Sequence, residues 1–267
     1  MIDHSPMDRF RRVRFGVVVA AVVIAALAPL AVILGAVGVR AHLFSLLIGF
    51  DWLAVRIAPA LAVAGLVLGG LGLIAAAAPP RRGAVASLVA IAIGASTLAV
   101  LVLWRSTMAA APPVHDVSTD WTRTQLFSEK LMLARGLTAN PIETNPVVPQ
   151  SAASRALAGQ YVGVVNARTC PAATPVVLTA APAVAYGRVK GAVVSAHLIV
   201  VTDDPAHGLI EATQTSGLFG FRDDIALSLS AAGAGTRIDM RASARTGQSD
   251  FGRDCKLVTR LRRALNG

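Results

Sequence analysis

Residues 236–245, TRIDMRASAR, alternate between two kinds of side chain and decide the fold of the second half of the chain. One set is apolar: Ile238, Met240, Ala242 and Ala244. The other set is polar: Arg237, Asp239, Arg241, Ser243 and Arg245. A period of two residues predicts a β-strand with one apolar and one polar face. We therefore expect a strand that buries its apolar face in the core of a folded domain.

The segments before this strand extend it into a sheet. Residues 224–230 alternate in the same way, and the turn AAGAG at 231–235 joins the two runs, which predicts an antiparallel hairpin. Residues 209–215 and 197–202 are two further predicted strands, joined by the turn-rich stretch DDPAHG.

Two predicted helices flank these strands. Pro182 suits the first turn of a helix that we expect to end at Ser195. Residues 250–265 carry an apolar stripe at helical spacing, with arginines near the C-terminal end. The order helix, four strands, helix predicts an α+β domain: an antiparallel sheet of four or more strands, with helices packed on one face.

The first hundred residues belong to a different class of structure. The chain is 54% hydrophobic and 15% charged, against about 25% charged for a soluble domain. Three runs without charge, at 15–39, 57–78 and 83–104, are long enough to cross a hydrocarbon core of about 30 Å. The first is longer than the apolar core of a signal peptide, which spans about 7–15 residues. We predict a basic N-terminus, residues 1–14, and a three-span transmembrane region, residues 15–104.

Basic residues predict the orientation of the spans, since they favour the cytoplasmic side. Arg9, Arg11, Arg12 and Arg14 precede the first span, and Arg81–Arg82 separate the second from the third. If both groups are cytoplasmic in a bacterial inner membrane, the chain leaves the third span on the periplasmic side. We therefore predict a linker at residues 105–114 and a periplasmic domain at residues 115–267.

Residues 41–55 are the weak point of this topology. They are apolar except for His42 and Asp51, and Trp52 suits an interfacial helix. If they crossed the bilayer instead, the domain would be cytoplasmic.

Partners can be inferred only by class. The bilayer lipid is one, and no nucleic acid is expected, because no recognition motif accompanies the net charge of +10. Gly65 and Gly69 allow close helix approach, either within the chain's own bundle or against another membrane protein or a second copy. The spans lack the ionisable residues that mark ion paths and transporters.

The sheet carries the candidate binding residues: Asp224, Asp239, Arg241, Arg245 and Asp250. Three interpretations stay open. In the first, the charges form a solvated sheet face with ion pairs between them. In the second, Asp224 and Asp250 bind turns through backbone amides or bind the arginines. In the third, Arg241 and Arg245 form a groove for an anion, since planar guanidinium groups suit a carboxylate or phosphate.

Catalytic and metal-binding patterns are absent from the sequence. His115, His197 and His207 have no metal-ligand spacing, and neither G-x-S-x-G nor S-x-x-K occurs. We assign no catalytic residue, metal or cofactor. Cys170 and Cys255 both fall in the domain expected outside, where either a disulfide or two free thiols is compatible with the sequence.

Three ordered motifs resemble a known family: HDVSTD at 115–120, GLIEATQTSGLFGFRDDIALSL at 208–229 and IDMRASARTGQSDFGRDCKLVTRL at 238–261. They are similar to the bacterial and plastid family catalogued as domain of unknown function 1499. The chain departs from that pattern at Ala242 and Ala244, where Ser is usual, and at Asp254, where Asn is usual. The resemblance implies no particular activity.

Two functional hypotheses follow. The favoured one is a non-enzymatic membrane protein whose extracytoplasmic domain binds a protein partner or an envelope ligand. The alternative is a hydrolase-like envelope enzyme acting on a lipid or cell-wall substrate, with Asp223, Asp224 and Arg241 at its site.

Overall fold

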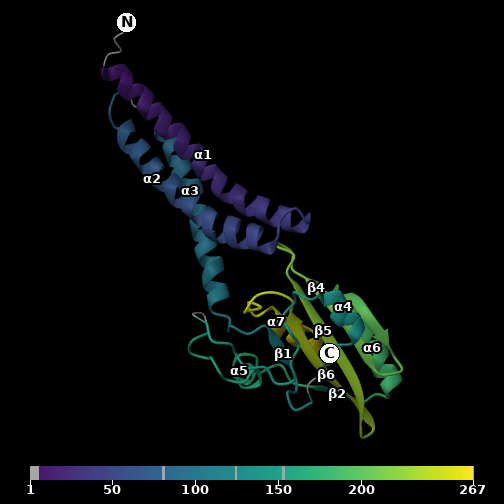
Figure 1. The fold of residues 1–267 in the computed structure, drawn as a ribbon. Helices are drawn as coiled ribbons and strands as arrows, with labels where there is room; N and C mark the ends of the chain where they lie inside the picture. The colour runs from purple at the N-terminus through teal and green to yellow at the C-terminus, as the bar shows by residue number, and fades with distance from the viewer. Residues whose placement is uncertain (1–5, 80–81, 124, 152–153, 267) are drawn as a thin grey trace. The chain divides into compact units, whose positions relative to one another are not determined.

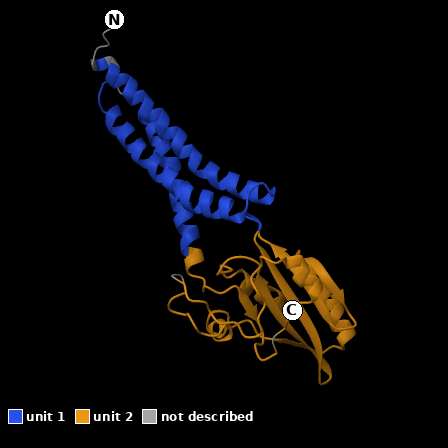
Figure 2. Ribbon diagram, viewed as in Figure 1, with its two compact units in different colours: residues 1–106, 217–220 blue, residues 107–216, 221–267 orange. Residues whose placement is uncertain are grey.

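The computed structural model describes residues 6–79, 82–123, 125–151 and 154–266. The chain forms two compact units (Figure 2). The helical unit comprises residues 1–106 with the loop 217–220, and the sheet domain comprises residues 107–216 and 221–267.

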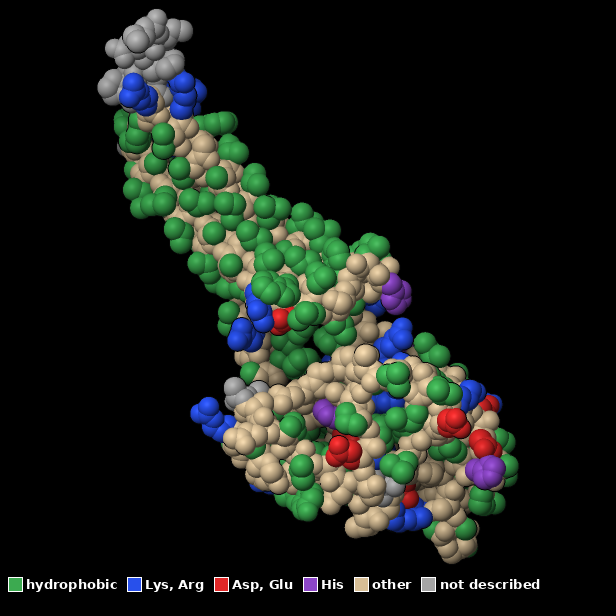
Figure 3. Space-filling view, viewed as in Figure 1, with side chains coloured by type: hydrophobic (Ala, Val, Ile, Leu, Met, Phe, Trp, Pro, Cys, Tyr) green, Lys and Arg blue, Asp and Glu red, His purple; other side chains and the backbone are tan. Residues whose placement is uncertain are grey.

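The helical unit contains α1 (Pro6–Arg40), the π-helix η1 (Leu47–Ile57), α2 (Ala58–Ala76) and α3 (Ala84–Ala109) (Figure 1). Three helical stretches among the described residues are long and apolar enough to cross a membrane: Arg9–Arg40, Leu47–Ala76 and Ala84–Ala109. Apolar side chains cover the outside of these helices (Figure 3). The three predicted apolar helices are confirmed, and the chain is a membrane-associated protein.

Residues 41–55 do not form a helix of their own. Residues Leu47–Ile57 run directly into α2, with helical backbone angles at Ile57, so the two form one long helix. The local charge is neutralised, because Asp51 pairs with Arg56 at 2.9 Å. Gly49 lies against Gly35 of α1 so closely that an added Cβ would come within 2.5 Å of the Gly35 carbonyl oxygen. This backbone contact fixes η1 against α1.

Both glycines of the small-xxx-small pair are buried within the bundle. A Cβ on Gly65 would lie 2.8 Å from the Ala25 backbone of α1. One on Gly69 would lie 2.8 Å from Ile91 of α3. The small residues thus allow α2 to pack closely against α1 and α3 of the same chain.

The described residues of the sheet domain form six strands: β1 (Asp116–Ser118), β2 (Val176–Leu178), β3 (Ile199–Asp204), β4 (Leu209–Thr215), β5 (Arg222–Ala232) and β6 (Gly235–Ala244). Their order is β1-β6-β5-β4-β3, all antiparallel, and β2 also pairs with β6. The predicted hairpin is present, with Ser230 opposite Arg237. All four predicted strands are confirmed, whereas β1 and β2 are too short to show a period of two residues.

The helices in the described part of this domain are α4 (Glu129–Arg135), α5 (Val162–Thr169), α6 (Pro182–Ser195) and α7 (Arg253–Asn266). Helices α6 and α7 bury Val189, Val193, Leu257 and Leu261 in one core with the apolar face of the sheet. The α+β class is confirmed.

The opposite face of the sheet is covered as well, so the interpretation as a solvated polar face is wrong. Phe127 and Leu131 of the α4 region pack against Ala226 of β5. Beside them Arg241 and Ser243 are fully buried and Arg245 is 8% exposed. The apolar cover comes from a segment more than a hundred residues away in sequence, and the pattern of β6 alone carries no sign of it.

A disulfide joins Cys170, at the end of α5, to Cys255 in the first turn of α7. The Cα atoms are 5.8 Å apart, within the range that a disulfide spans without distortion. Of the two options that the sequence left open, the structure has the bridge.

Candidate functional site

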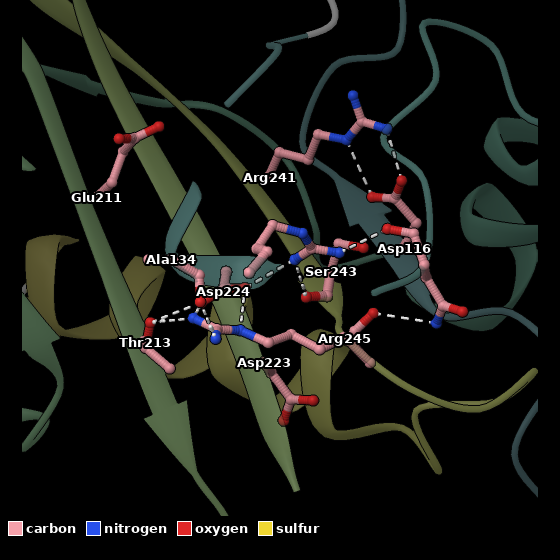
Figure 4. A network of polar contacts seen from close by, with 12 residues as sticks. Asp116, Ala134, Glu211, Thr213, Asp223, Asp224, Arg241, Ser243 and Arg245 are labelled. Carbon is pink, nitrogen blue, oxygen red and sulfur yellow. Dashed lines mark hydrogen bonds and ion pairs between the residues drawn. The ribbon is translucent and has the colours of Figure 1, made fainter. Parts of the chain in front are cut away.

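The buried polar face of the sheet centres on Arg241. Its guanidinium forms a bidentate ion pair with the carboxylate of Asp116 on β1, with Nε–Oδ1 at 3.0 Å and Nη2–Oδ2 at 2.5 Å (Figure 4). Antiparallel pairing of β1 with β6 brings the two side chains together. Its Nη1 and Nη2 also donate to the carbonyl oxygens of Gln125 (2.8 Å) and Glu143 (2.7 Å), respectively. Arg241 therefore ties two covering loops to the sheet.

A second cluster surrounds Asp224 on β5. Its carboxylate accepts from Arg245 at 2.8 Å on each oxygen, from Arg135 of α4 at 2.8 Å, and from the Thr213 hydroxyl at 2.6 Å. Asp224 is fully buried, as is the side chain of Arg135. One carboxylate thus binds two guanidinium groups. Arg135 also donates to the carbonyl oxygens of Ser243 (3.1 Å) and Asn140 (2.9 Å), and its buried Nε has no hydrogen-bond partner in the described part of the chain.

Burial dominates the electrostatics of both clusters. It raises the pKa of the Asp116 carboxyl, and the hydrogen bonds and charge of Arg241 oppose that rise. It lowers the pKa of Arg135, which the adjacent Asp224 counteracts. Since a buried ion is costly unless it is paired and hydrogen-bonded, these groups depend on one another.

Glu211 on β4 holds the start of α4. Its carboxylate accepts from the Ser128 backbone N–H at 2.7 Å and from the Ser128 hydroxyl. The same hydroxyl accepts from the Leu131 N–H at 3.2 Å, so Ser128 is the N-cap of α4. A fully buried carboxylate thereby positions the helix that supplies Arg135.

Three acidic residues surround the start of α7. Asp223 receives a bidentate contact from Arg253, both distances being 2.7 Å. Asp250 accepts from the backbone N–H groups of Gly252 (2.7 Å) and Asp254 (2.9 Å), as an N-terminal cap does. Burial, and after it the charges of Asp250 and Asp223, raises the pKa of Asp254 well above its usual value.

The structure divides the five predicted site residues among separate contacts. Asp224 and Arg245 meet directly, whereas Arg241 pairs with Asp116. Asp239 pairs with Arg237, and Asp250 caps α7. Of the three interpretations, these contacts match the second, because Asp224 binds an arginine and Asp250 binds backbone amides at the turn before α7.

Sequence reasoning missed Arg135 and Arg253 and did not place Asp116 in the site. Arg135 lies in a seven-residue helix 89 positions from its partner Asp224, and no local pattern marks it. Asp116 carried a signal, because it belongs to the motif HDVSTD.

Residues 116–265 match the family model described as "Protein of unknown function (DUF1499)". The chain belongs to this family. The match covers the whole sheet of the domain, from β1 to α7, and leaves out the apolar helices α1 to α3 and η1. No curated protein and no solved structure matches the chain significantly.

In the DUF1499 domain, the three motifs supply polar contacts on both faces of the sheet. The first supplies Asp116, the second Glu211, Asp223 and Asp224, and the third Arg241, Arg245, Asp250 and Arg253. Because consecutive residues of a strand point to opposite faces, Asp224 lies with Arg245 on one face, whereas Asp223 contacts Arg253 of α7 on the other. Figure 4 shows the contacts of Asp116 with Arg241 and of Asp224 with Arg245.

Ligand-sized space lies elsewhere in the DUF1499 domain. A pocket of about 670 Å³ is enclosed by α7, the end of α5 and residues 110–117. Its apolar wall includes Val114, Val117 and the disulfide. Its cations come from α7: Lys256, Arg260 and Arg263.

The cations of this pocket differ from those of the network in being accessible. Lys256, Arg260 and Arg263 are exposed at helical spacing on α7, and Arg260 donates to Gln214 at 2.8 Å. Among the described residues, no carboxylate pairs with Lys256 or Arg263 within 4.0 Å. On the opposite wall Asn166 is buried, and its Oδ1 has no hydrogen-bond partner in the described part of the chain.

The pocket can therefore hold a molecule with both an apolar body and a negative group, with Asn166 accepting a bond from a hydroxyl. As for metals, no group of three His, Cys, Asp or Glu side chains suited to an ion occurs in the residues that the structure describes.

Proposed function

We propose that this protein is a membrane-anchored binding protein whose sheet domain takes an anionic amphiphile of the cell envelope in the pocket along α7. The single observation that carries the proposal is the composition of that pocket. An apolar wall of Val114, Val117 and the Cys170–Cys255 bridge faces exposed cations of α7. A site of about 670 Å³ is in the range of small-molecule pockets, which combine apolar walls with a few placed polar groups.

The distribution of charge in the domain favours this pocket over the polar face of β6. Asp223, Asp224 and Arg241 are fully buried and bonded to other groups of the chain. Lys256 and Arg263 carry charges that a ligand can reach without breaking an ion pair. An incoming carboxylate or phosphate would gain charge-assisted hydrogen bonds there.

The orientation of the chain in the membrane is part of the same proposal. The N-terminal arginines and Arg81–Arg82 support a cytoplasmic N-terminus in a bacterial inner membrane, with the DUF1499 domain in the periplasm. The disulfide supports the oxidising compartment for that domain. An envelope amphiphile is then the ligand class present on the domain's side of the membrane.

Photo-crosslinking of the full-length protein in nanodiscs tests the ligand site. A long-chain carboxylate with a photoreactive group in its chain should label residues 107–117 and α7. Lys256→Gln combined with Arg263→Gln should reduce that labelling at least about tenfold, because the loss of even one charge-assisted hydrogen bond of about 1.5 kcal/mol corresponds to that factor. Both side chains are exposed, so the fold should be unaffected.

The matched control is Lys130→Gln combined with Arg188→Gln, two exposed cations of the same domain outside the pocket. It removes the same net charge and should leave the labelling unchanged. Labelling confined to the apolar helices, or equal losses in the two double variants, would refute the proposal.

A further inference from the structure

A second cavity, a groove between α1 and the beginning of α3, lies in the helical unit and has a volume of about 880 Å³. Its two ends differ in chemistry. Arg11, Arg14 and Arg82 line one end, and Val19, Val22 and Val23 continue along α1. Basic side chains stand at this end of the helices and apolar ones below them (Figure 3).

Arg14 is the unusual member of this group, because it is 7% exposed. Its guanidinium donates to the Ala78 carbonyl oxygen at 3.2 Å. Among the described side chains, no carboxylate lies within 4.0 Å of Arg11, Arg14 or Arg82, and the acid–base pair present in the helical unit is Asp51–Arg56. Since no described carboxylate pairs with this nearly buried cation, an anion at this end would stabilise the bundle.

The length of the groove indicates what kind of anion fits. From Arg14 to Val23 the helix rises about 13 Å, nearly half of a hydrocarbon core. Free phosphate would use the arginine end alone. A phospholipid would use both ends, its phosphate bonded by the guanidinium forks and an acyl chain laid along the valines.

We infer that this groove is a binding site for an anionic phospholipid, with its headgroup phosphate at Arg11, Arg14 and Arg82 and an acyl chain on Val19, Val22 and Val23. Basic pockets between transmembrane helices are a recurring way to hold such lipids. The site is separate from the pocket along α7 and uses none of its residues.

The test counts lipids retained by the full-length protein in native mass spectrometry after transfer from mixed micelles. Phosphatidylglycerol should be retained, phosphatidylcholine should not, and inorganic phosphate should not compete. Arg11→Gln with Arg82→Gln should weaken phosphatidylglycerol binding roughly tenfold. Both residues are exposed, so the substitutions spare the buried Arg14.

Two matched controls sharpen the result. Arg9→Gln with Arg12→Gln removes the same charge from exposed positions of α1 outside the groove and should retain the lipid. Val19→Trp should displace the acyl chain without changing any charge, whereas Val37→Trp, on an exposed position near the other end of α1, should not.

Three outcomes would overturn the inference: equal retention of phosphatidylcholine, competition by inorganic phosphate, or equal losses in the two double arginine variants. Lys256→Gln with Arg263→Gln should leave phosphatidylglycerol retention intact, so failure at one site is distinguishable from failure at the other.

Discussion

Asp116 and Arg241 lie 125 residues apart in sequence and meet in a bidentate ion pair from which solvent is excluded. The indole of Trp121 lies over the guanidinium at 5.3 Å. The pair joins β1, the first strand of the DUF1499 domain, to β6, the last, so the packing of β1 on the sheet depends on it.

Removal of one member of this pair should destabilise the sheet domain strongly. Asp116→Ala leaves the Arg241 cation buried without its counter-charge, and such losses cost about 3–5 kcal/mol. The free energy of unfolding should fall by that amount. It can be measured from the proteolytic susceptibility of the full-length protein in urea. Arg123→Ala is the control: its side chain is 51% exposed and 3.6 Å from Asp239, so the expected cost is below about 1 kcal/mol. A small effect of Asp116→Ala would contradict the assigned role.

Asp254→Asn should stabilise the protein at neutral pH. Burial and the charges of Asp250 and Asp223 raise the pKa of Asp254, so the folded protein binds a proton more tightly there than the unfolded chain does. Stability is then greatest below the unfolded pKa, about 3.9, and falls as the pH rises toward the folded pKa. An Asn oxygen can still accept from the Ala244 N–H, which lies 3.1 Å from Asp254 Oδ2.

Thermal melts at several pH values check this prediction. Each kcal/mol recovered should raise Tm by about 2–4 °C, and the dependence of Tm on pH should flatten. Asp250→Ala is the contrasting variant. It also removes a charge, but it leaves the N–H groups of Gly252 and Asp254 without their acceptor, and it should lower Tm. If both variants gave the same sign, the roles assigned to these two residues would be wrong.

Opening of the disulfide should cost several kcal/mol. The bridge closes a loop with a sequence separation of 85 residues, for which chain entropy gives about 4 kcal/mol of stabilisation. Cys170→Ser with Cys255→Ser should lower the midpoint of urea unfolding, and dithiothreitol should lower the wild-type midpoint to the same value. The double variant itself should not respond to dithiothreitol; a response would place the effect of the reductant elsewhere.

The proposed orientation predicts opposite signals from two reporter fusions. Alkaline phosphatase, which is active only in the periplasm, should be active when fused after Gly267 and silent when fused at Arg82. The reason is that three spans separate the basic N-terminus from the sheet domain, and basic loops stay cytoplasmic. A silent fusion at Gly267 would place the domain in the cytoplasm and remove the envelope ligand from the proposal.

Local sequence pattern was sufficient where each residue's neighbours in the chain decide its environment. The three apolar runs had to become long helices, because lipid offers no partner for free backbone groups. Strand Leu209–Thr215 and helix Pro182–Ser195 were predicted at the residues where the structure has them, since alternation and a first-turn proline act within a few positions.

Tertiary structure decided everything that depends on distant segments. The polar side of β6 has the alternation of a solvated strand, yet Phe127 and Leu131 cover that side of the sheet and make Arg241 and Arg245 interior residues. The partners of those arginines come from β1, β5 and α4, and pairing across such separations leaves no periodic trace in the sequence. The sequence thus determined the three long apolar helices, the four longer strands and the helices α6 and α7, and the packing of the chain determined which charges are buried and which stay exposed.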